Sequence, residues 1–207
     1  MTPVPSWIAD EQWRELHPPA EVMRLGELPR APEKLLLASR SLRVTDAKRY
    51  RPLPAATWCN IYLADVCDIL QAPIPHLFDP DGAGPIPEME LRANHIVDGL
   101  RAKRFNGWFK IGTMASISAA ITLANEGHPV VATWANPNPV KDAKGKQKRD
   151  RNGLPVFHAG HVVLLVPTPE GKRGAFATGA GRRCVEQCPI AEAFGLVLSQ
   201  VELWHHE

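Results

Sequence analysis

Helical patterns dominate the first part of this chain, and short strand-like runs dominate the second. Apolar residues recur at helical spacing in 33–44, 59–70, 88–103 and 116–128. Short runs rich in β-branched and aromatic residues lie at 107–112, 129–136, 158–167 and 174–179. We expect 185–195 to form a short helical turn. Helices that mostly precede an antiparallel sheet define the α+β class, which is the fold that we predict.

The length and composition are those of one globular domain with an extension. The chain has 207 residues, of which 44% are hydrophobic, so it can bury a sizeable core. Its 20 prolines predict many connections and short elements. Residues 1–34 are rich in proline, and we interpret them as an N-terminal arm with one short helix at 9–16. Residues 35–207 are predicted to form the folded domain.

Charge and hydropathy exclude several classes of partner. The net charge of +2 is too small to indicate nucleic-acid binding. The longest apolar run, 161–167, is too short to cross a membrane. The N-terminus lacks the basic start and apolar run of a signal peptide. We therefore expect a soluble chain made in the cytoplasm, with neither nucleic acid nor membrane as partner, that reaches an outside target after lysis or by specialised export.

Cys59 begins an amphipathic helical pattern, and Thr57 is a plausible N-cap for that helix. The start of a helix stabilises a thiolate, and its backbone N–H groups can hold a developing oxyanion. From these residues alone, Cys59 is a small apolar core residue, a metal ligand or a nucleophile. Cys67, two turns further on, has no such advantage and is predicted to lie in the core.

A nucleophilic thiol needs a rigidly held base, and His161 is the best placed of the eight histidines. It begins a buried strand and should share a face with Val163 and Leu165, because side chains alternate along a strand. In a regular strand His158 would face the other way. The alternative to a catalytic role is a structural one, in which His161 is buried and hydrogen-bonds a carbonyl group.

The remaining cysteines carry little signal for a metal. Cys184 and Cys188 are four residues apart, which is half a zinc site at most, and His205 and His206 at the chain end would have to complete it. We expect free thiols in a reducing compartment and no metal or cofactor.

Residues 137–155 form a polar, basic segment between two predicted strands. The segment carries six cationic residues: Lys141, Lys144, Lys146, Lys148, Arg149 and Arg151. We predict a mobile loop that is either merely solvated or forms a basic rim that attracts an anionic substrate.

Several motifs in order along the chain resemble one family. The stretch "RYRPLPAATWCNIYLADVCDILQAPIPH" resembles the nucleophile motif of a bacterial and phage group within the NlpC/P60 and CHAP-like cysteine peptidases. "LRANHIVDGL", "ANEGHPVVATWANP" and "GHVVLLVP" resemble its next helix, its helix–Gly–strand step and the Gly-His-Val strand that carries the base. "GAGRRCVEQCPIAEAFG" loosely follows its closing segment. The match covers roughly residues 35 to 200.

The resemblance implies a papain-like fold with Cys59 as nucleophile and His161 as base. It implies positioning roles for Trp58 and Asn60 and substrate contacts by two aromatic residues, Tyr50 and Trp134. The third catalytic residue usually lies on the strand after the histidine, where relatives often have an amide or an acid. Thr178 is the hydrogen-bonding side chain of "GAFATGAG" and is the candidate here.

Members of this family mostly cut amide bonds in peptidoglycan stem peptides. The resemblance therefore implies a peptidoglycan amidase or endopeptidase, either a phage-type lysin or an exported antibacterial effector with a cognate immunity protein. Two alternatives stay open. An acyltransferase or deamidase acting on protein glutamine would use the same thiolate, and a non-catalytic wall-binding module would carry an inert Cys59.

Overall fold

The computed structural model describes residues 4–10, 14, 16–53, 58–75, 92–149 and 155–207 of the chain. The described helices are α1 (Ala20–Met23), α2 (Pro32–Ser41), α3 (Cys59–Ile69), α4 (Ala93–Arg101), α5 (Ile117–Asn125) and α6 (Ile190–Phe194). Short 3-10 helices are η1 (Arg24–Gly26), η2 (Lys48–Tyr50), η4 (Met114–Ser116) and η5 (Gly195–Gln200). The strands are β1 (Trp108–Thr113), β2 (Val130–Trp134), β3 (His161–Val166), β4 (Phe176–Gly179), β5 (Val185–Pro189) and β6 (Glu202–His206).

The strands form one six-stranded antiparallel sheet in the order β1-β6-β2-β3-β4-β5. The α+β class is therefore confirmed. Two elements differ from the sequence-based expectation. Residues 185–195 contain strand β5 before the helical turn α6, and the last strand, β6, was not predicted. It lies between β1 and β2, so His205 and His206 belong to the sheet rather than to a loose terminus.

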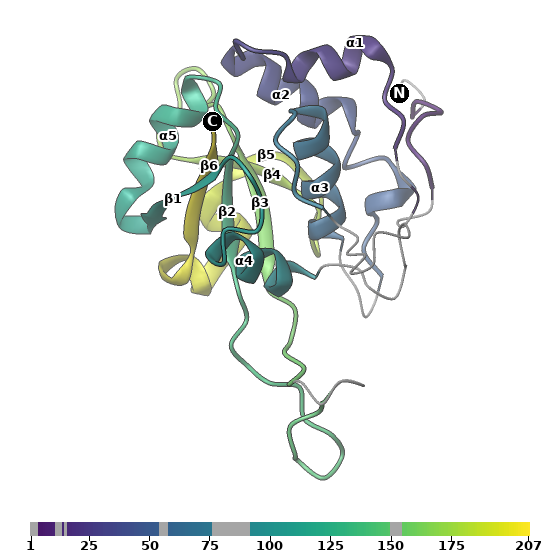
Figure 1. Cartoon of the computed structure of the whole chain (residues 1–207), viewed down its shortest axis with the longest axis vertical. Coiled ribbons are helices and arrows are strands. Elements are labelled where there is room, and N and C mark those ends of the chain that lie inside the picture. Colours follow the sequence, from purple (N-terminus) through teal and green to yellow (C-terminus); the bar gives the residue numbers. More distant parts are fainter. Residues whose placement is uncertain (1–3, 11–13, 15, 54–57, 76–91, 150–154) are drawn as a thin grey trace.

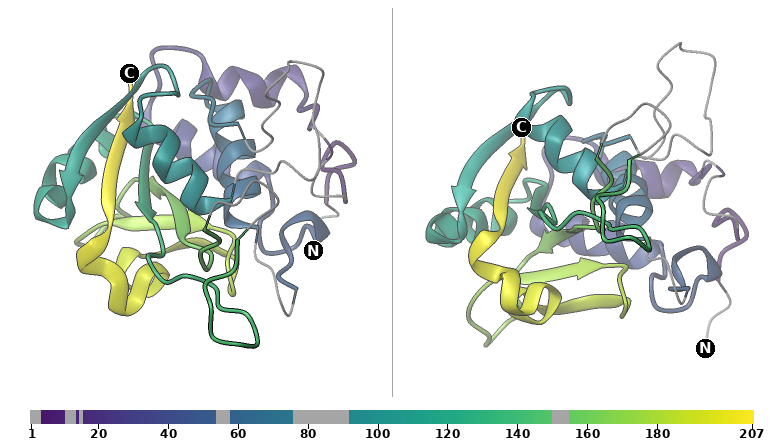
Figure 2. Two further views of the ribbon diagram at one scale, coloured as in Figure 1. Left: turned by 60° about the horizontal axis from the view of Figure 1, so that its bottom comes forward. Right: turned by 90° about the horizontal axis from the view of Figure 1, so that it is seen from below.

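Helices cover both faces of the sheet (Figures 1 and 2). We call the face that carries α2, α3 and α4 the near face. Its buried strand residues include Val131, Val162, Leu164, Val166 and Trp204. We call the opposite face, covered by α5, α6 and η5, the far face. Its buried strand residues include Val130, Ala132, Val163, Leu165, Ala177 and Leu203. Consecutive residues of each strand thus enter different cores, as the period of two requires.

The N-terminal arm packs on the near-face core instead of standing apart from it. Ile8 is buried in that core. The Arg30 guanidinium donates through Nε to the carbonyl oxygens of Gly26 (3.2 Å) and Leu70 (3.1 Å). Leu70 is the C-cap of α3, where carbonyl groups lack helical partners and a cation is favourable. Arg30 therefore ties the arm to the end of α3. Of the helix predicted at 9–16, residues 11–13 and 15 lie outside the described residues, and the other four are not helical.

A buried ion pair holds the start of the domain against α3. Asp65 accepts from Arg49 at both carboxylate oxygens, 2.7 Å from Nε and 3.0 Å from Nη2. The hydroxyl of Tyr50 donates to the same carboxylate at 2.8 Å. Arg49 and Tyr50 are fully buried, and Asp65 is 6% exposed. Every charge in this group is matched, which is the condition under which a buried carboxylate is tolerated.

The segment between β2 and β3 is paired over its described residues. Isolated bridges join Pro139 to Phe157, Lys141 to Gln147 and Arg149 to Pro155. The prediction of a mobile loop overlooked this pairing, because a polar and basic composition does not reveal backbone hydrogen bonds.

We expect Asp65→Asn to lower the free energy of unfolding by about 3 kcal/mol or more, because it leaves the Arg49 charge buried without a counter-ion. Chemical denaturation measures the change. The matched control is Asp10→Asn, which removes the carboxylate of the exposed Lys48–Asp10 pair at 3.0 Å. That loss should stay below about 1 kcal/mol. Equal losses in the two variants would contradict the role given to the buried pair.

Candidate active site

Cys59 is the first residue of α3, as the sequence predicted. It is 3% exposed. Trp58 is the N-cap residue in place of Thr57, and its indole Nε1 donates to the carbonyl oxygen of Arg51 at 2.9 Å. Thr57 lies outside the described residues. The helix's own hydrogen bonds do not use the N–H groups of its first turn, and these groups carry the positive end of the helix dipole. Cys59 therefore has the location that favours a thiolate.

Helix α3 runs in the same direction as β3. Near its start, the Tyr62 hydroxyl lies 2.8 Å from Thr178 Oγ1, and Thr178 pairs with Leu164 in the middle of β3. At its other end Leu70 is bound by Arg30, whose carbonyl lies against Gly127 just before β2. Since β2 is antiparallel to β3, that end lies where β3 finishes (Figure 1). Cys59 therefore lies toward the end at which β3 begins with His161.

His161 nevertheless lies on the far face of the sheet. It shares that face with Val163 and Leu165, as predicted, but α3 packs on the other face, against Val162 and Leu164. The ring of His161 makes an edge contact with Phe194, with ring centroids 5.2 Å apart. The described contacts therefore do not bring His161 to Cys59. The sequence argument placed the histidine in the correct register and could not tell which face the helix would cover.

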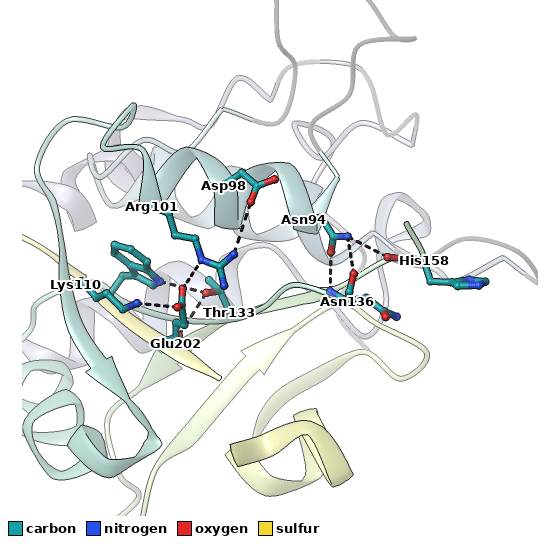
Figure 3. A network of polar contacts seen from close by, with 9 residues as sticks. Asn94, Asp98, Arg101, Lys110, Thr133, Asn136, His158 and Glu202 are labelled. Carbon is teal, nitrogen blue, oxygen red and sulfur yellow. Dashed lines mark hydrogen bonds and ion pairs between the residues drawn. The ribbon is translucent and has the colours of Figure 1, made fainter. Parts of the chain in front are cut away.

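The surroundings of His161 favour the neutral imidazole. Burial lowers the pKa of His161 to about 4. Gly181, two residues after the end of β4, faces the ring, and a Cβ atom there would lie 3.2 Å from its Cε1. Trp134 is the cross-strand partner of His161 in β2 and belongs to the same face. His158 precedes the strand, is exposed and points away from the sheet (Figure 3).

Thr178 faces α3, on the opposite side of the sheet from the observed ring of His161. Its hydroxyl donates to the carbonyl oxygen of Val185 at 2.9 Å, so it accepts from the Tyr62 hydroxyl. It is the cross-strand partner of Leu164 and lies on the face of Leu164, whereas His161 lies on the other face. The structure therefore does not bring Thr178 to His161, and its catalytic role stays a prediction. Its hydroxyl links α3 to the sheet.

The residues predicted to contact substrate have other neighbours in the structure. Tyr50 is fully buried, and burial raises the pKa of its hydroxyl well above the usual value. It binds Asp65 and is not available to a substrate. Trp134 lies on the far face, and its Nε1 donates to Gln200 Oε1 at 3.2 Å. Asn60 is buried at 4% exposure beside Cys59 in the first turn of α3, which suits a positioning role.

The other three thiols have packing or hydrogen-bonding neighbours of their own. Cys67 is fully buried in the near-face core, and burial raises the pKa of its thiol. Cys184 is half-buried and donates to the carbonyl oxygen of Tyr50 at 3.2 Å, while Cys188 is buried. Within the described ranges, no group of three or more histidine, cysteine or acidic side chains is arranged to hold a metal ion. In the same ranges, no helix is long and apolar enough to cross a membrane.

Sequence reasoning missed two polar residues that position this region, Asp65 and Asn94. Asp65 interrupts an apolar helical face, and a charge at such a position signals a buried partner. Asn94 gave no comparable signal. Its amide binds three backbone groups in residues 136 and 158, which no local pattern connects to it.

The chain matches no protein-family model and no curated protein. The resemblance to NlpC/P60 and CHAP-like peptidases therefore depends on the motifs themselves.

We expect the buried neutral imidazole of His161 to make the fold sensitive to acid. Below its usual pKa of 6.5 the unfolded chain gains a proton at this position, while the folded chain resists protonation until about pH 4. The contribution of this group to the free energy of unfolding is fully present above pH 6.5. It falls by roughly 3 kcal/mol as the pH is lowered toward 4.

Denaturation curves between pH 7 and pH 4 measure this loss. His161→Gln should flatten the decline relative to wild type, because glutamine does not titrate. His158→Gln, at an exposed position, should leave it unchanged. A decline of the same size in His161→Gln and wild type would show that other groups cause it.

Proposed function

We propose that this chain is a papain-like thiol hydrolase that cuts amide bonds in peptidoglycan stem peptides, with Cys59 as nucleophile and His161 as base. The observation that carries the proposal is the position of Cys59 as the first residue of a helix packed on an antiparallel sheet. Its helix runs alongside the strand that begins with His161. The ordered motifs that resemble NlpC/P60 and CHAP-like peptidases supply the substrate class.

The proposed reaction follows from the chemistry of a helix-start thiolate. The His161 imidazole takes the proton of the Cys59 thiol, and the sulfur attacks the carbonyl carbon of the scissile amide. Backbone N–H groups at the start of α3 stabilise the oxyanion. The imidazolium gives its proton to the leaving amine as the C–N bond breaks. Water, deprotonated by the imidazole, then attacks the thioester and releases the carboxylic acid and the thiol.

This mechanism requires His161 to reach the near face. In the structure its ring packs against Phe194 on the far face. The first residue of β3 must therefore rotate, so that its side chain reaches the near face when the site is active. His161 is the terminal residue of its strand, and Ala159 and Gly160 before it lie outside regular secondary structure. A rearrangement confined to this strand end would leave the remaining pairs of β2 and β3 in place.

A non-catalytic wall-binding module is the second candidate, and one observation favours it. The aromatic packing of His161 and its pKa of about 4 are those of a structural histidine. An acyltransferase or deamidase would pass through the same thioester, and its products would distinguish it. Release as a phage-type lysin and export as an antibacterial effector opposed by an immunity protein both suit the proposed substrate.

We expect Cys59→Ala to abolish the cleavage of purified peptidoglycan without loss of the fold. Mass spectrometry of the released muropeptides identifies the bond that is cut, and circular dichroism checks the fold. Cys67→Ala, in the same helix, is the control. It should lower stability by about 1 kcal/mol or somewhat more and retain turnover. A Cys59→Ala variant that digests walls at the wild-type rate would refute the nucleophile assignment.

We expect the alkylation of Cys59 by iodoacetamide to persist well below pH 8.5, roughly the pKa of an unperturbed thiol. The modified peptide is quantified by mass spectrometry, so that reaction at Cys184 is counted separately. His161→Ala should move the apparent pKa of Cys59 upward and remove most turnover, whereas His158→Ala should do far less. Identical alkylation profiles in wild type and His161→Ala, with normal thiol titration, would favour the non-catalytic module.

A further inference from the structure

The segment between β2 and β3 is a structured projection, which we call the basic arm (residues 137–158, of which 150–154 lie outside the description). Near the base, residues 138–140 pair with residues 156–158: Val140 N–H donates to Val156 O at 2.8 Å, and His158 N–H donates to Asn138 O at 3.0 Å. The backbone at Lys148 pairs with the first of these segments, since Lys148 N–H donates to Val140 O at 2.7 Å. Figure 1 shows the arm extending away from the helices and the sheet.

Asn94 of α4 binds both ends of the arm where it leaves the domain (Figure 3). Its Oδ1 accepts from Asn136 N–H at 3.0 Å, and its Nδ2 donates to the carbonyl oxygens of Asn136 (3.3 Å) and His158 (3.1 Å). Asn136 in turn donates through Nδ2 to Ala159 O at 3.2 Å. The base of the arm is therefore a side-chain and backbone network rather than a free hinge.

A tight turn shapes the outer part of the arm. Asp142 Oδ1 accepts from the N–H groups of Lys144 (2.9 Å) and Lys146 (3.0 Å). Gly145 has a φ of +77°, in the left-handed region that favours glycine. The described acid of the arm is thus engaged with the backbone of the turn.

The arm lysines, Lys141, Lys144, Lys146 and Lys148, are exposed. None of the ion pairs found among described residues includes them. Two cations of the domain, in contrast, are paired. Arg101 and Lys110 both bind the Glu202 carboxylate, at 3.0 Å and 2.7 Å (Figure 3). Among the described residues, no acid forms an ion pair with these lysines, so this part of the arm carries a concentration of positive charge, although the net charge of the whole chain is only +2.

The arm projects from the end of the domain where the candidate site lies. It leaves β2 at Trp134 and re-enters the sheet at His161, which is the end of β3 toward which Cys59 lies. Figure 2, in the view from below, shows the arm in front of this end of the domain. A polymer held by the arm lysines would therefore lie off the end of the domain at which α3 begins.

We propose that the basic arm is a docking element for the carboxylates of peptidoglycan stem peptides, which holds the wall polymer beside the Cys59 site. The inference rests on the proposed function, since that function supplies the anionic polymer. The arm acts on binding and not on chemistry, because exposed charges attract a polyanion through a screened field.

The test measures binding to purified peptidoglycan sacculi in a Cys59→Ala background, where no cleavage occurs. Replacing the four arm lysines by glutamine should weaken binding on the order of tenfold at low salt and flatten its salt dependence. The matched control replaces Lys103, Arg104, Lys172 and Arg173 by glutamine, which removes the same charge from exposed positions elsewhere. It should bind within about twofold of the parent protein.

Two further binding measurements identify the ligand. Sacculi whose carboxylates have been converted to amides should bind the parent protein as weakly as the arm variant binds untreated sacculi. Duplex DNA should bind the parent protein more weakly than sacculi do. Equal losses in the arm variant and the control, unchanged binding to amidated sacculi, or tighter binding to DNA would each overturn the proposal.

Turnover separates this inference from the proposed function. With Cys59 restored, the four-lysine variant should keep its kcat on a soluble stem peptide, and its KM on sacculi should rise. A fall in kcat on the soluble peptide would place the arm in the reaction and overturn its role in docking alone. Arm-dependent binding by a wild-type chain that cleaves nothing would refute the hydrolase and leave the docking arm intact.

Discussion

The packing of α3 on one face of the sheet determines the arrangement of the rest of this molecule. Two buried polar contacts hold the helix. Tyr62 of α3 donates to Thr178 of the sheet, and Asp65 of α3 accepts from Arg49 and Tyr50 of η2. Arg30 binds the last carbonyl groups of the helix. Because each partner is buried, a shift of α3 would leave a polar group without a hydrogen bond in the core. Cys59 inherits its position from these contacts.

The same packing separates the two residues that the family resemblance pairs. Side chains alternate along β3, so a helix that contacts Val162 and Leu164 cannot lie on the face of His161. The hydrolase proposal therefore carries a specific structural demand, which is a change of face at one strand terminus. Burial against Phe194 lowers the pKa of His161 and favours the neutral ring. A neutral imidazole that moved to the near face would be ready to accept the thiol proton.

Charge is distributed so that the domain and the arm play different parts. In the domain, Asp65 joins α3 to η2 through Arg49 and Tyr50. Glu202 joins β6 to α4 and β1 through Arg101 and Lys110. In the arm, Asp142 is used by a turn and the lysines face solvent. The backbone pairing of the arm holds these lysines close together without any hydrophobic core beneath them. A wall polymer rich in carboxylates complements such a projection.

The sequence alone determined the features that depend on local periodicity. It predicted the α+β class, the start of α3 at Cys59, four of the six strands and the face that His161 shares with Val163. It did not predict β6, whose partners β1 and β2 are distant in sequence, or the pairing inside the arm. The tertiary structure alone decided that α3 covers the face opposite His161 and that Thr178 points to Tyr62. A strand pattern states which residues share a face, but only the packed helices decide which core that face enters.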